Sequence, residues 1–303
     1  METKPILAVV TGPTASGKTE LAIRLAEHYD TEIISADSRQ IFRDLPIGTA
    51  APSAEERSRA FHHLVGTHEL DAYYSASLFE SDALAILPEI WKKSPVAVVC
   101  GGSMMYIDAL CRGLDEMPTV SDSTRAYVLS MLENHGLEGV LAQLEICDHD
   151  YWQQVDRSNT RRVIHAVEIS LEAGVPYSSL RTGRVTERPF RIMKFAIERS
   201  RDELFGRINA RVDRMIADGL EDEARRAFSR GNFNSLNTVG YKEMAAYFRG
   251  DMDFDTAVAR IGKNTRVYAK KQLTWMSRDP EIIRLAPAEA FDEAVKAIDS
   301  QLP

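Results

Sequence analysis

The sequence predicts an α/β fold in which a doubly wound parallel sheet carries a helical insertion. Over residues 1–117, short apolar segments alternate with amphipathic helical stretches, as a parallel sheet covered by helices on both faces requires. Between residues 118 and 188 helical periodicity continues, but no segment has the pattern of a strand. An apolar segment returns at 190–197, so residues 189–303 are expected to rejoin the sheet and add the last helices.

The individual elements follow from the spacing of apolar residues. An aliphatic strand at 6–10 precedes a glycine-rich turn and an amphipathic helix at 20–28. Further strands are expected at 32–35, 96–100, 190–197 and 282–285. Further helices are expected at 77–91, within 121–175, and at 201–217, 220–228, 241–248, 254–277 and 288–298. The crossovers between parallel strands should be right-handed.

The composition excludes several classes of protein. The 303 residues are 44% hydrophobic and 27% charged, which suits a globular protein rather than a disordered or fibrous one. No apolar run approaches the roughly 18 residues of a membrane span, and the start, METKPILAVV, lacks the apolar core of a secretory signal. A cytoplasmic protein is therefore expected. Cys100, Cys111 and Cys147 lack C-x-x-C spacing and indicate buried thiols.

The net charge of −8 conceals two basic segments. Residues 1–156 carry 11 basic and 24 acidic side chains, whereas residues 157–214 carry 13 and 7, and residues 260–278 carry 6 and none. Because charges are screened beyond about 8 Å at physiological salt, a phosphate backbone responds to such local patches more than to the total. Taken alone, each basic segment is explained more simply as a helix face that is exposed to solvent.

A phosphate-binding loop is the clearest motif. Residues 12–19, GPTASGKT, match G-x-x-x-x-G-K-[ST] and lie between an expected strand and an expected helix. Glycines let the backbone curl so that N–H groups point at phosphate oxygens, and the helix N-terminus adds partial positive charge. Lys18 supplies a full charge, and the Thr19 hydroxyl can ligate Mg²⁺. A bound di- or triphosphate is therefore predicted at Gly12, Pro13, Thr14, Ala15, Ser16, Gly17, Lys18 and Thr19.

The phosphate compound is left open, since neither a Walker B aspartate nor an NKxD motif follows. Asp37 comes just after the second expected strand, and Gly101, Gly102 and Ser103 follow the third. In an open α/β sheet these strand ends converge with the loop on one cleft. Asp37 could act there as a general base or an indirect Mg²⁺ ligand, or it could only cap a turn or helix. The two glycines could simply precede a helix that begins at Ser103.

Each basic segment places cations at helical spacing. In the first, Arg161, Arg162 and His165 share one broad face. The second carries cations at steps of three or four residues, interleaved with an aromatic ring and followed by Thr274 and Trp275. Its members are Arg260, Lys263, Arg266, Tyr268, Lys270 and Lys271. A ladder of cations with aromatic rings suits an RNA backbone and unstacked bases.

Taken together, these motifs resemble the tRNA dimethylallyltransferase family, also called tRNA isopentenyltransferases. The matching segments run in order along most of the chain: GPTASGKT at 12–19, ISADSRQIFRDLPIGTAAP at 34–52, HHL at 62–64, YSASLFESDA at 74–83, VVCGGSMMY at 98–106, RRVIHAVEI at 161–169, VGYKEM at 239–244 and NTRVYAKKQLTWM at 264–276. Many families share the phosphate loop, but DSRQ, GGS and AKKQLTW in combination are specific.

The resemblance implies a P-loop NTPase-like core with a helical insertion that grips the anticodon stem-loop of tRNA. It implies transfer of a dimethylallyl group from its diphosphate to N6 of the adenosine just 3′ of the anticodon, in tRNAs that read codons beginning with U. Mg²⁺ would accompany the diphosphate, and a monomer is expected. By similarity, Asp37 takes the proton from the amine and Thr14 hydrogen-bonds the bridging oxygen of the donor. Lys18, with Arg207 or Arg211, would neutralise the departing diphosphate.

The same similarity implies a larger set of residues that meet tRNA, so that both basic segments become functional. They are Asp37, Ser38, Arg39, Gln40, Ser103, Arg125, Arg161, Arg162, Val163, Ile164, His165, Asn237, Thr238, Val239, Gly240, Tyr241, Lys242, Lys270, Lys271, Gln272, Leu273, Thr274, Trp275, Met276 and Ser277. His165 stands where the family has arginine, and a histidine is only partly charged near neutral pH.

Two other functions fit parts of the sequence. A small-molecule kinase would use the same strand, phosphate loop and Asp37 for ATP and a hydroxyl acceptor, but it would leave the basic segments unexplained. An RNA-binding module with a vestigial phosphate loop is disfavoured because Gly12, Gly17, Lys18 and Thr19 are intact.

Overall fold

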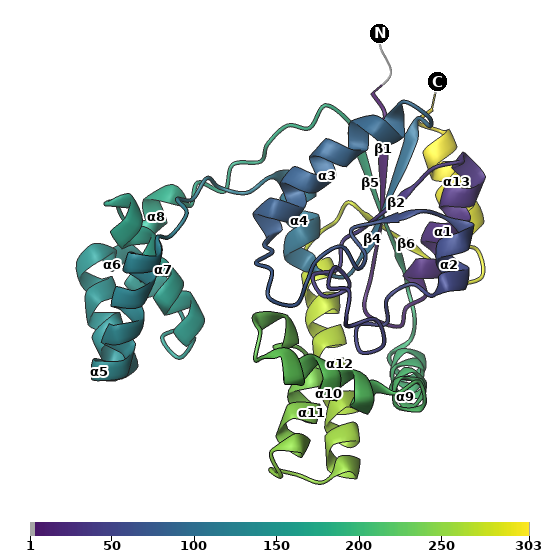
Figure 1. Cartoon of the computed structure of the whole chain (residues 1–303). Coiled ribbons are helices and arrows are strands. Elements are labelled where there is room, and N and C mark those ends of the chain that lie inside the picture. Colours follow the sequence, from purple (N-terminus) through teal and green to yellow (C-terminus); the bar gives the residue numbers. More distant parts are fainter. Residues whose placement is uncertain (1–3, 303) are drawn as a thin grey trace. The chain divides into compact units, whose positions relative to one another are not determined.

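A computed structural model describes residues 4–302 and shows two compact units (Figure 1). The larger unit takes the chain up to Cys111 and again from Glu187, and the smaller unit is 112–186. The sequence predicts the smaller unit at 118–188, whereas the observed unit starts and ends earlier. Its incoming and outgoing segments are tied together, since the Thr182 hydroxyl donates to Asp115 Oδ1 at 2.6 Å.

The larger unit is built on a six-stranded parallel sheet with the order β3-β2-β4-β1-β5-β6. Its strands are β1 (Ile6–Thr11), β2 (Ile33–Ser35), β3 (His62–His63), β4 (Val96–Gly101), β5 (Arg191–Ile197) and β6 (Ile282–Leu285). The strands predicted from the sequence are confirmed. The edge strand β3 was missed because two histidines form neither an apolar run nor an alternating pattern.

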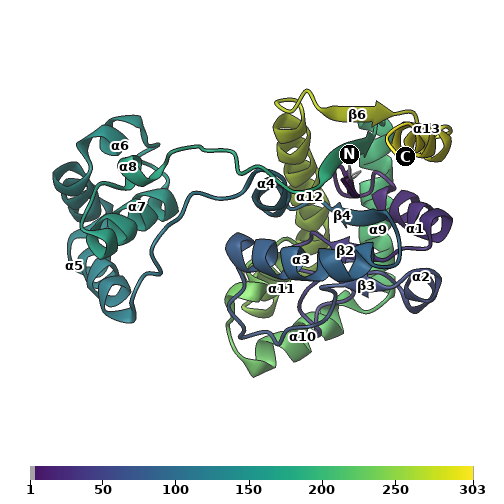
Figure 2. The same cartoon turned by 90° about the horizontal axis from the view of Figure 1, so that it is seen from above.

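Helices cover both faces of this sheet. Side chains of β1 alternate between two hydrophobic cores, Leu7 and Val9 on one face and Ala8 and Val10 on the other. Figure 2 shows α1 and α13 on one side of the sheet and α3 and α4 on the other, as a doubly wound fold requires. The covering helices are α1 (Lys18–Tyr29), α2 (Ala54–Arg59), α3 (Ala76–Trp91), α4 (Met104–Arg112) and α13 (Ala290–Asp299).

The remaining helices of the larger unit lie beyond the carboxyl ends of the strands (Figure 1). They are α9 (Arg201–Ala217), α10 (Leu220–Arg230), the 3-10 turn η1 (Asn234–Leu236), α11 (Tyr241–Phe248) and α12 (Phe254–Met276). The predicted helices of this unit are confirmed, with bounds that differ by no more than one or two residues. These helices close over the edge of the sheet where the strands end, so they supply a second wall to any site there.

The smaller unit is helical, as the sequence predicted. It contains α5 (Asp122–Cys147), α6 (His149–Gln154), α7 (Thr160–Ala173) and α8 (Tyr177–Leu180). Gly136 interrupts α5 with φ 65° and ψ −169°, which no helical residue adopts. The unit has its own core of aliphatic side chains from α5 and α7. No helix within residues 4–302 combines the length and hydropathy needed to cross a membrane.

Candidate active site

The loop at residues 12–19 joins β1 to α1 and curls into a cradle. Gly12 and Gly17 have φ of 149° and 101°, and a Cβ on Gly12 would lie 2.9 Å from Ser16 Oγ, so neither position tolerates a side chain. The Ser16 hydroxyl is buried without a hydrogen-bond partner within the described residues. The cradle ends on the N-terminus of α1, where backbone N–H groups attract anions.

Two half-buried cations, Lys18 and Arg211, lie at this cradle and line the adjoining cavity. Burial lowers the pKa of Lys18, and the positive charge of Arg211 lowers it further, while Asp37 acts in the opposite direction. Burial also lowers the pKa of Arg211. Burying like charges together costs free energy unless an anion compensates them. The positive charges of these two side chains therefore favour the binding of an anion, such as a phosphate group, in the cradle.

The cradle opens into a cavity of about 370 Å³ that is lined by the larger unit alone. This reaction cavity brings the ends of β1, β2 and β4 together with α9, α11 and α12, as expected for an open α/β sheet. Many residues singled out from the sequence meet here: Thr14, Lys18, Thr19, Asp37, Ser38, Arg39, Gln40, Ser103, Arg211, Asn237, Thr238, Val239, Gly240, Lys242 and Gln272.

One wall of the reaction cavity is apolar and was missed by the sequence analysis. Ile208, Val212 and Met215 project from α9, and Ile261 projects from α12. The first three follow the i, i+4, i+7 spacing that predicts a buried helix face. Such spacing does not distinguish a face that packs against protein from one that packs against a ligand.

Asp37 both caps a turn and faces the reaction cavity. Its Oδ1 accepts the N–H of Arg39 at 2.9 Å and the N–H of Gln40 at 3.3 Å. Its Oδ2 takes no part in these turn bonds, and the residue lines the cavity. The capping alternative is confirmed, and the role as a base or an indirect Mg²⁺ ligand stays a prediction that the position of Oδ2 allows.

Two arginines of α9 contact the phosphate loop in different ways. Arg211 donates from Nη1 to Thr14 Oγ1 at 2.9 Å. Arg207 is exposed and donates from Nε to the carbonyl oxygen of Ala15 at 2.8 Å. Within the described part of the chain, Arg211 lines the reaction cavity and Arg207 does not. This difference favours Arg211 over Arg207 as the residue expected to contact a diphosphate.

Gln272 ties the phosphate loop to the end of β4. Its Oε1 accepts the N–H of Thr14 at 3.0 Å, and its Nε2 donates to the carbonyl oxygen of Gly102 at 2.9 Å. The side chain is buried. The resemblance placed Gln272 among the tRNA contacts, whereas the structure shows its amide engaged with the protein on both sides.

Several other residues expected to meet tRNA have side chains packed inside their own unit. Val163, Tyr241 and Met276 belong to three hydrophobic cores. Trp275 is half-buried, and its Nε1 donates to Asp108 Oδ2 at 2.8 Å. Contact with RNA at the three core positions would have to come from the backbone.

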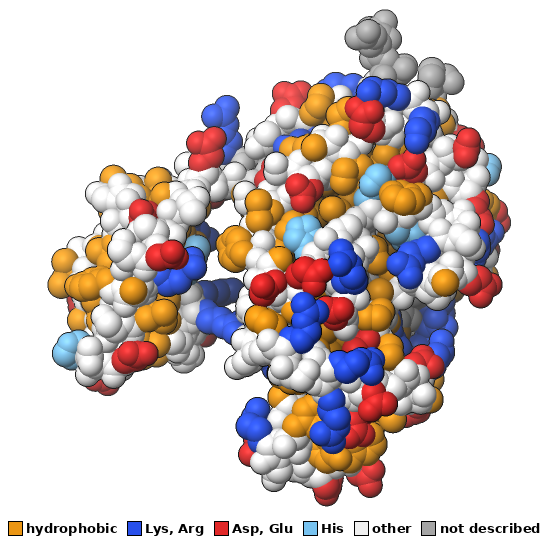
Figure 3. All heavy atoms as spheres, in the orientation of Figure 1, with side chains coloured by type: hydrophobic (Ala, Val, Ile, Leu, Met, Phe, Trp, Pro, Cys, Tyr) orange, Lys and Arg blue, Asp and Glu red, His pale blue; other side chains and the backbone are white. Residues whose placement is uncertain are grey.

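The expected cationic contacts, by contrast, are exposed. Lys270 and Lys271 lie on the outer face of α12, and Arg125, Arg161 and Arg162 lie on the surface of the smaller unit. Figure 3 shows that basic and acidic side chains are interspersed on the face in view, so this face carries no single large basic field.

His165 differs from these cations. Its ring packs edge-on against Tyr177 with centroids 5.5 Å apart. This packing removes water from one face of the ring and lowers the pKa of His165. The shift disfavours the charged form of His165, so its side chain is a weaker cationic contact than the neighbouring arginines.

The parallel sheet, with the phosphate cradle between β1 and α1, defines a P-loop protein, and a carboxylate and an apolar wall adjoin the cradle. The sequence matches the family described as IPP transferase over residues 40–279, and the family described as isopentenyl transferase over residues 5–65. The chain belongs to the IPP transferase family.

Individual relatives cover nearly the whole chain. It is 52% identical over 283 residues to tRNA dimethylallyltransferase 2 of Parabacteroides distasonis, covering 93% of this chain and 95% of that protein. It is 49% identical over 278 residues to tRNA dimethylallyltransferase 1 of Bacteroides thetaiotaomicron, covering 92% and 90%. The crystal structure of full-length tRNA isopentenylpyrophosphate transferase from Bacillus halodurans matches with a TM-score of 0.72 at 29% identity, covering 99% and 97%. The family resemblance and the fold class are confirmed.

Proposed function

We propose that this protein transfers a dimethylallyl group from dimethylallyl diphosphate to N6 of the adenosine just 3′ of the anticodon, in tRNAs that read codons beginning with U. One observation carries the proposal: a phosphate cradle, an apolar wall and a carboxylate line a single cavity. The diphosphate, the five-carbon chain and the amine each find matching chemistry there. The relatives named tRNA dimethylallyltransferase support the assignment.

The diphosphate of the donor binds in the loop formed by residues 12–19. Negative charge grows on its oxygens as the allylic C–O bond breaks, and fixed N–H groups, the N-terminus of α1, Lys18 and Arg211 stabilise that charge. The sequence left open whether Arg207 or Arg211 neutralises the departing diphosphate. We assign this role to Arg211, because it lines the cavity and donates to Thr14 Oγ1. The Thr14 hydroxyl, held by this bond, would donate a hydrogen bond to the bridging oxygen of the donor.

Mg²⁺ fits beside the diphosphate. Thr19 and Asp37 both line the reaction cavity, and within residues 4–302 no group of three or more His, Cys, Asp or Glu forms a separate metal site. Mg²⁺ is commonly held by one or two protein oxygens together with substrate phosphates and water. Thr19 directly, and Asp37 through water, would hold it where it neutralises the leaving group.

The apolar wall holds the prenyl chain and excludes water from the allylic carbon, which gains cationic character as the diphosphate leaves. The N6 amine of an extruded adenosine forms the new C–N bond as the C–O bond breaks, and Asp37 accepts the proton that the amine loses. Extruding the base costs a few kcal/mol, which contacts with the rest of the RNA offset.

The exposed cations of α12 and of the smaller unit supply contacts to the phosphates of the anticodon stem-loop. The resemblance to the family supports action as a monomer. We assign the protein to the cytoplasm, where its tRNA substrate is found.

Incubation of unmodified tRNA with the protein and labelled dimethylallyl diphosphate tests the proposal, with labelled ATP in a parallel reaction. Label from the prenyl donor should appear on N6 of the adenosine next to the anticodon. Transfer of phosphate from ATP would instead identify a kinase, and RNA binding without transfer of either label would identify a binding module. Both results would contradict the proposal.

A further inference from the structure

A buried carboxylate on α10 has no role in the reaction as described so far. Glu223 is 3% exposed, and a charged side chain is rarely buried without a full set of partners. Its Oε2 accepts the N–H of Ile47 at 2.8 Å, and its Oε1 accepts the N–H of Gly48 at 2.8 Å. The Tyr241 hydroxyl donates to Oε1 at 2.6 Å. Three donors from two separate segments of the chain therefore meet on this one side chain.

These bonds join two of the segments on which the family resemblance rests, IGTAAP at 47–52 and VGYKEM at 239–244. The Gly48 backbone lies so close to the Tyr241 ring that a Cβ on Gly48 would be 2.5 Å from the hydroxyl oxygen. Tyr241 is fully buried, and its burial together with Glu223 raises the pKa of its hydroxyl, which therefore stays protonated and donates. The carboxylate, the ring and the glycine thus pack as one unit.

The backbone that Glu223 holds belongs to a tight turn at residues 46–50. Within this turn the N–H of Ala50 donates to the carbonyl oxygen of Ile47 at 2.9 Å. Ala50 has φ 46°, a left-handed conformation that a residue with a Cβ keeps only where its surroundings hold it. Gly48 and Thr49 line the reaction cavity. The carboxylate on α10 therefore anchors a strained turn that forms part of the cavity wall.

The 46–50 turn also contacts Arg211. The carbonyl oxygen of Ala50 accepts a hydrogen bond from Gln40 Nε2 at 3.0 Å and a longer one from Arg211 Nη2 at 3.4 Å. Arg211 Nη1 donates to Thr14 Oγ1 in the phosphate loop. A planar guanidinium with a separate partner on each Nη rotates less freely than one with a single partner. The Ala50 carbonyl is therefore one of two points that hold this guanidinium beside the phosphate loop.

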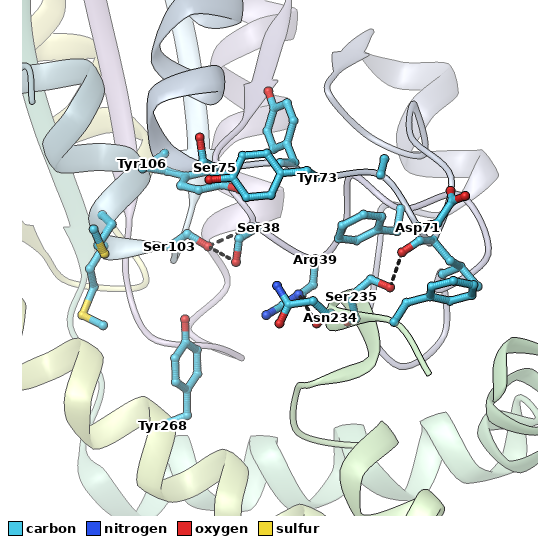
Figure 4. Close-up of a pocket in the computed structure, with 18 residues that line it drawn as sticks. Ser38, Arg39, Asp71, Tyr73, Ser75, Ser103, Tyr106, Asn234, Ser235 and Tyr268 are labelled. Atoms are coloured by element: carbon cyan, nitrogen blue, oxygen red, sulfur yellow. Dashed lines mark hydrogen bonds between the residues drawn. The ribbon is translucent and has the colours of Figure 1, made fainter. Parts of the chain in front are cut away.

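We propose that Glu223 is a positioning residue for Arg211. It holds the 46–50 turn, the turn places the carbonyl oxygen of Ala50, and that oxygen orients the Arg211 guanidinium toward the diphosphate of the donor. The inference rests on the proposed function, since it takes Arg211 as the residue that neutralises the leaving group. Within the described residues, Glu223 lines neither the reaction cavity nor the neighbouring cavity shown in Figure 4, so it acts through the turn and not by touching a substrate.

Glu223→Gln tests this proposal, because the amide keeps the shape of the side chain but replaces one acceptor oxygen with a donor that faces an N–H group. Glu221→Gln is the matched control, since Glu221 also lies in the first turn of α10 but pairs with Arg225. Two quantities are measured: the Kd for inorganic diphosphate with Mg²⁺, by calorimetry, and kcat/KM for dimethylallyl diphosphate in prenyl transfer. Thermal unfolding verifies that each variant folds. If Glu223→Gln does not fold, Glu223→Asp carries the same test, because it keeps the charge but is one methylene too short to reach the turn.

Glu223→Gln should raise the Kd for diphosphate and lower kcat/KM for the donor, each about fivefold, as expected for coupled groups in one hydrogen-bond network. Glu221→Gln should leave both quantities unchanged. In a protein that already carries Arg211→Lys, Glu223→Gln should cost less than about twofold, because the guanidinium that it positions is gone. In a protein that carries Arg207→Lys, it should still cost about fivefold.

Equal losses from Glu223→Gln in the Arg211→Lys and Arg207→Lys proteins would overturn the proposal, because Glu223 would then support the fold and not Arg211. Unchanged diphosphate binding in Glu223→Gln would overturn it as well. Failure of the unchanged protein to prenylate tRNA would be a different result, which contradicts the proposed function. Diphosphate binding, which needs no reaction, would still decide whether Glu223 positions Arg211.

Discussion

Gln272 Oε1 accepts the backbone N–H of Thr14 at 3.0 Å, although 258 residues separate the two in the chain. The other end of the same amide donates to Gly102, at the end of β4. A helix whose outer face carries the expected RNA contacts thus also fixes the loop expected to hold the diphosphate. Gln272 is therefore a positioning residue for the phosphate cradle.

Gln272→Met should weaken donor binding. The substitution preserves volume but removes the acceptor of the Thr14 N–H and the closer donor to the Gly102 carbonyl. An unsatisfied buried group costs about 1–3 kcal/mol. We expect KM for dimethylallyl diphosphate to rise about tenfold, while the affinity for tRNA in a filter-binding assay stays within about twofold. If the variant instead loses affinity for tRNA and keeps its KM for dimethylallyl diphosphate, Gln272 contacts tRNA and does not position the phosphate loop.

Asp37→Asn should impair turnover far more than binding. Asparagine preserves the shape of the side chain and can still accept the turn hydrogen bonds from Arg39 and Gln40, but it cannot accept a proton. We expect kcat to fall by about 10² or more, with tRNA affinity nearly intact. Single-turnover kinetics with a saturating donor measure this directly, and a near-normal rate would remove Asp37 from the role of base.

Arg211→Lys and Arg207→Lys form a matched pair on α9. Lysine keeps the charge but loses the planar donor geometry that reaches Thr14 Oγ1. We expect Arg211→Lys to reduce kcat/KM for the donor at least tenfold, because a charged hydrogen bond at the leaving group is lost. Arg207→Lys, outside the reaction cavity, should change it less than threefold. Equal losses would mean that the loop requires both arginines only for its shape.

Lys270→Ala should weaken tRNA binding in a way that depends on salt. If Lys270 meets a phosphate, its removal lowers the number of released counterions by about one. The slope of log K against log salt should therefore become less steep by about one, with donor affinity unchanged. Lys92→Ala, a change at an exposed lysine of the larger unit, is the control. An unaltered slope for Lys270→Ala would show that this lysine does not contact a phosphate.

The strands and helices could be predicted because their signals are local. Side chains repeat every two or about 3.6 residues, and β1, α9 and α11 are found where that spacing places them. The phosphate loop is local too, since eight consecutive residues carry the glycines, the lysine and the hydroxyl that it needs. The two-residue strand β3 was missed because it is too short and too polar to show either period.

The site could be predicted only in part. Asp37 and Lys18 follow from motifs, but the sequence did not distinguish Arg207 from Arg211, since both lie on one helix and the choice depends on which way that helix turns against the loop. The resemblance placed Gln272 among the RNA contacts, and no local pattern indicated its bonds to Thr14 and Gly102.

By itself, the sequence determined the α/β plan, the helical insertion and the phosphate cradle, because each depends on residues close together in the chain. Only the tertiary structure decided the apolar wall, the bond between Gln272 and Thr14, and the bonds from Glu223 to the turn at 46–50. These features join residues that are distant in sequence, and the packing of helices against the carboxyl ends of the sheet brings them within contact.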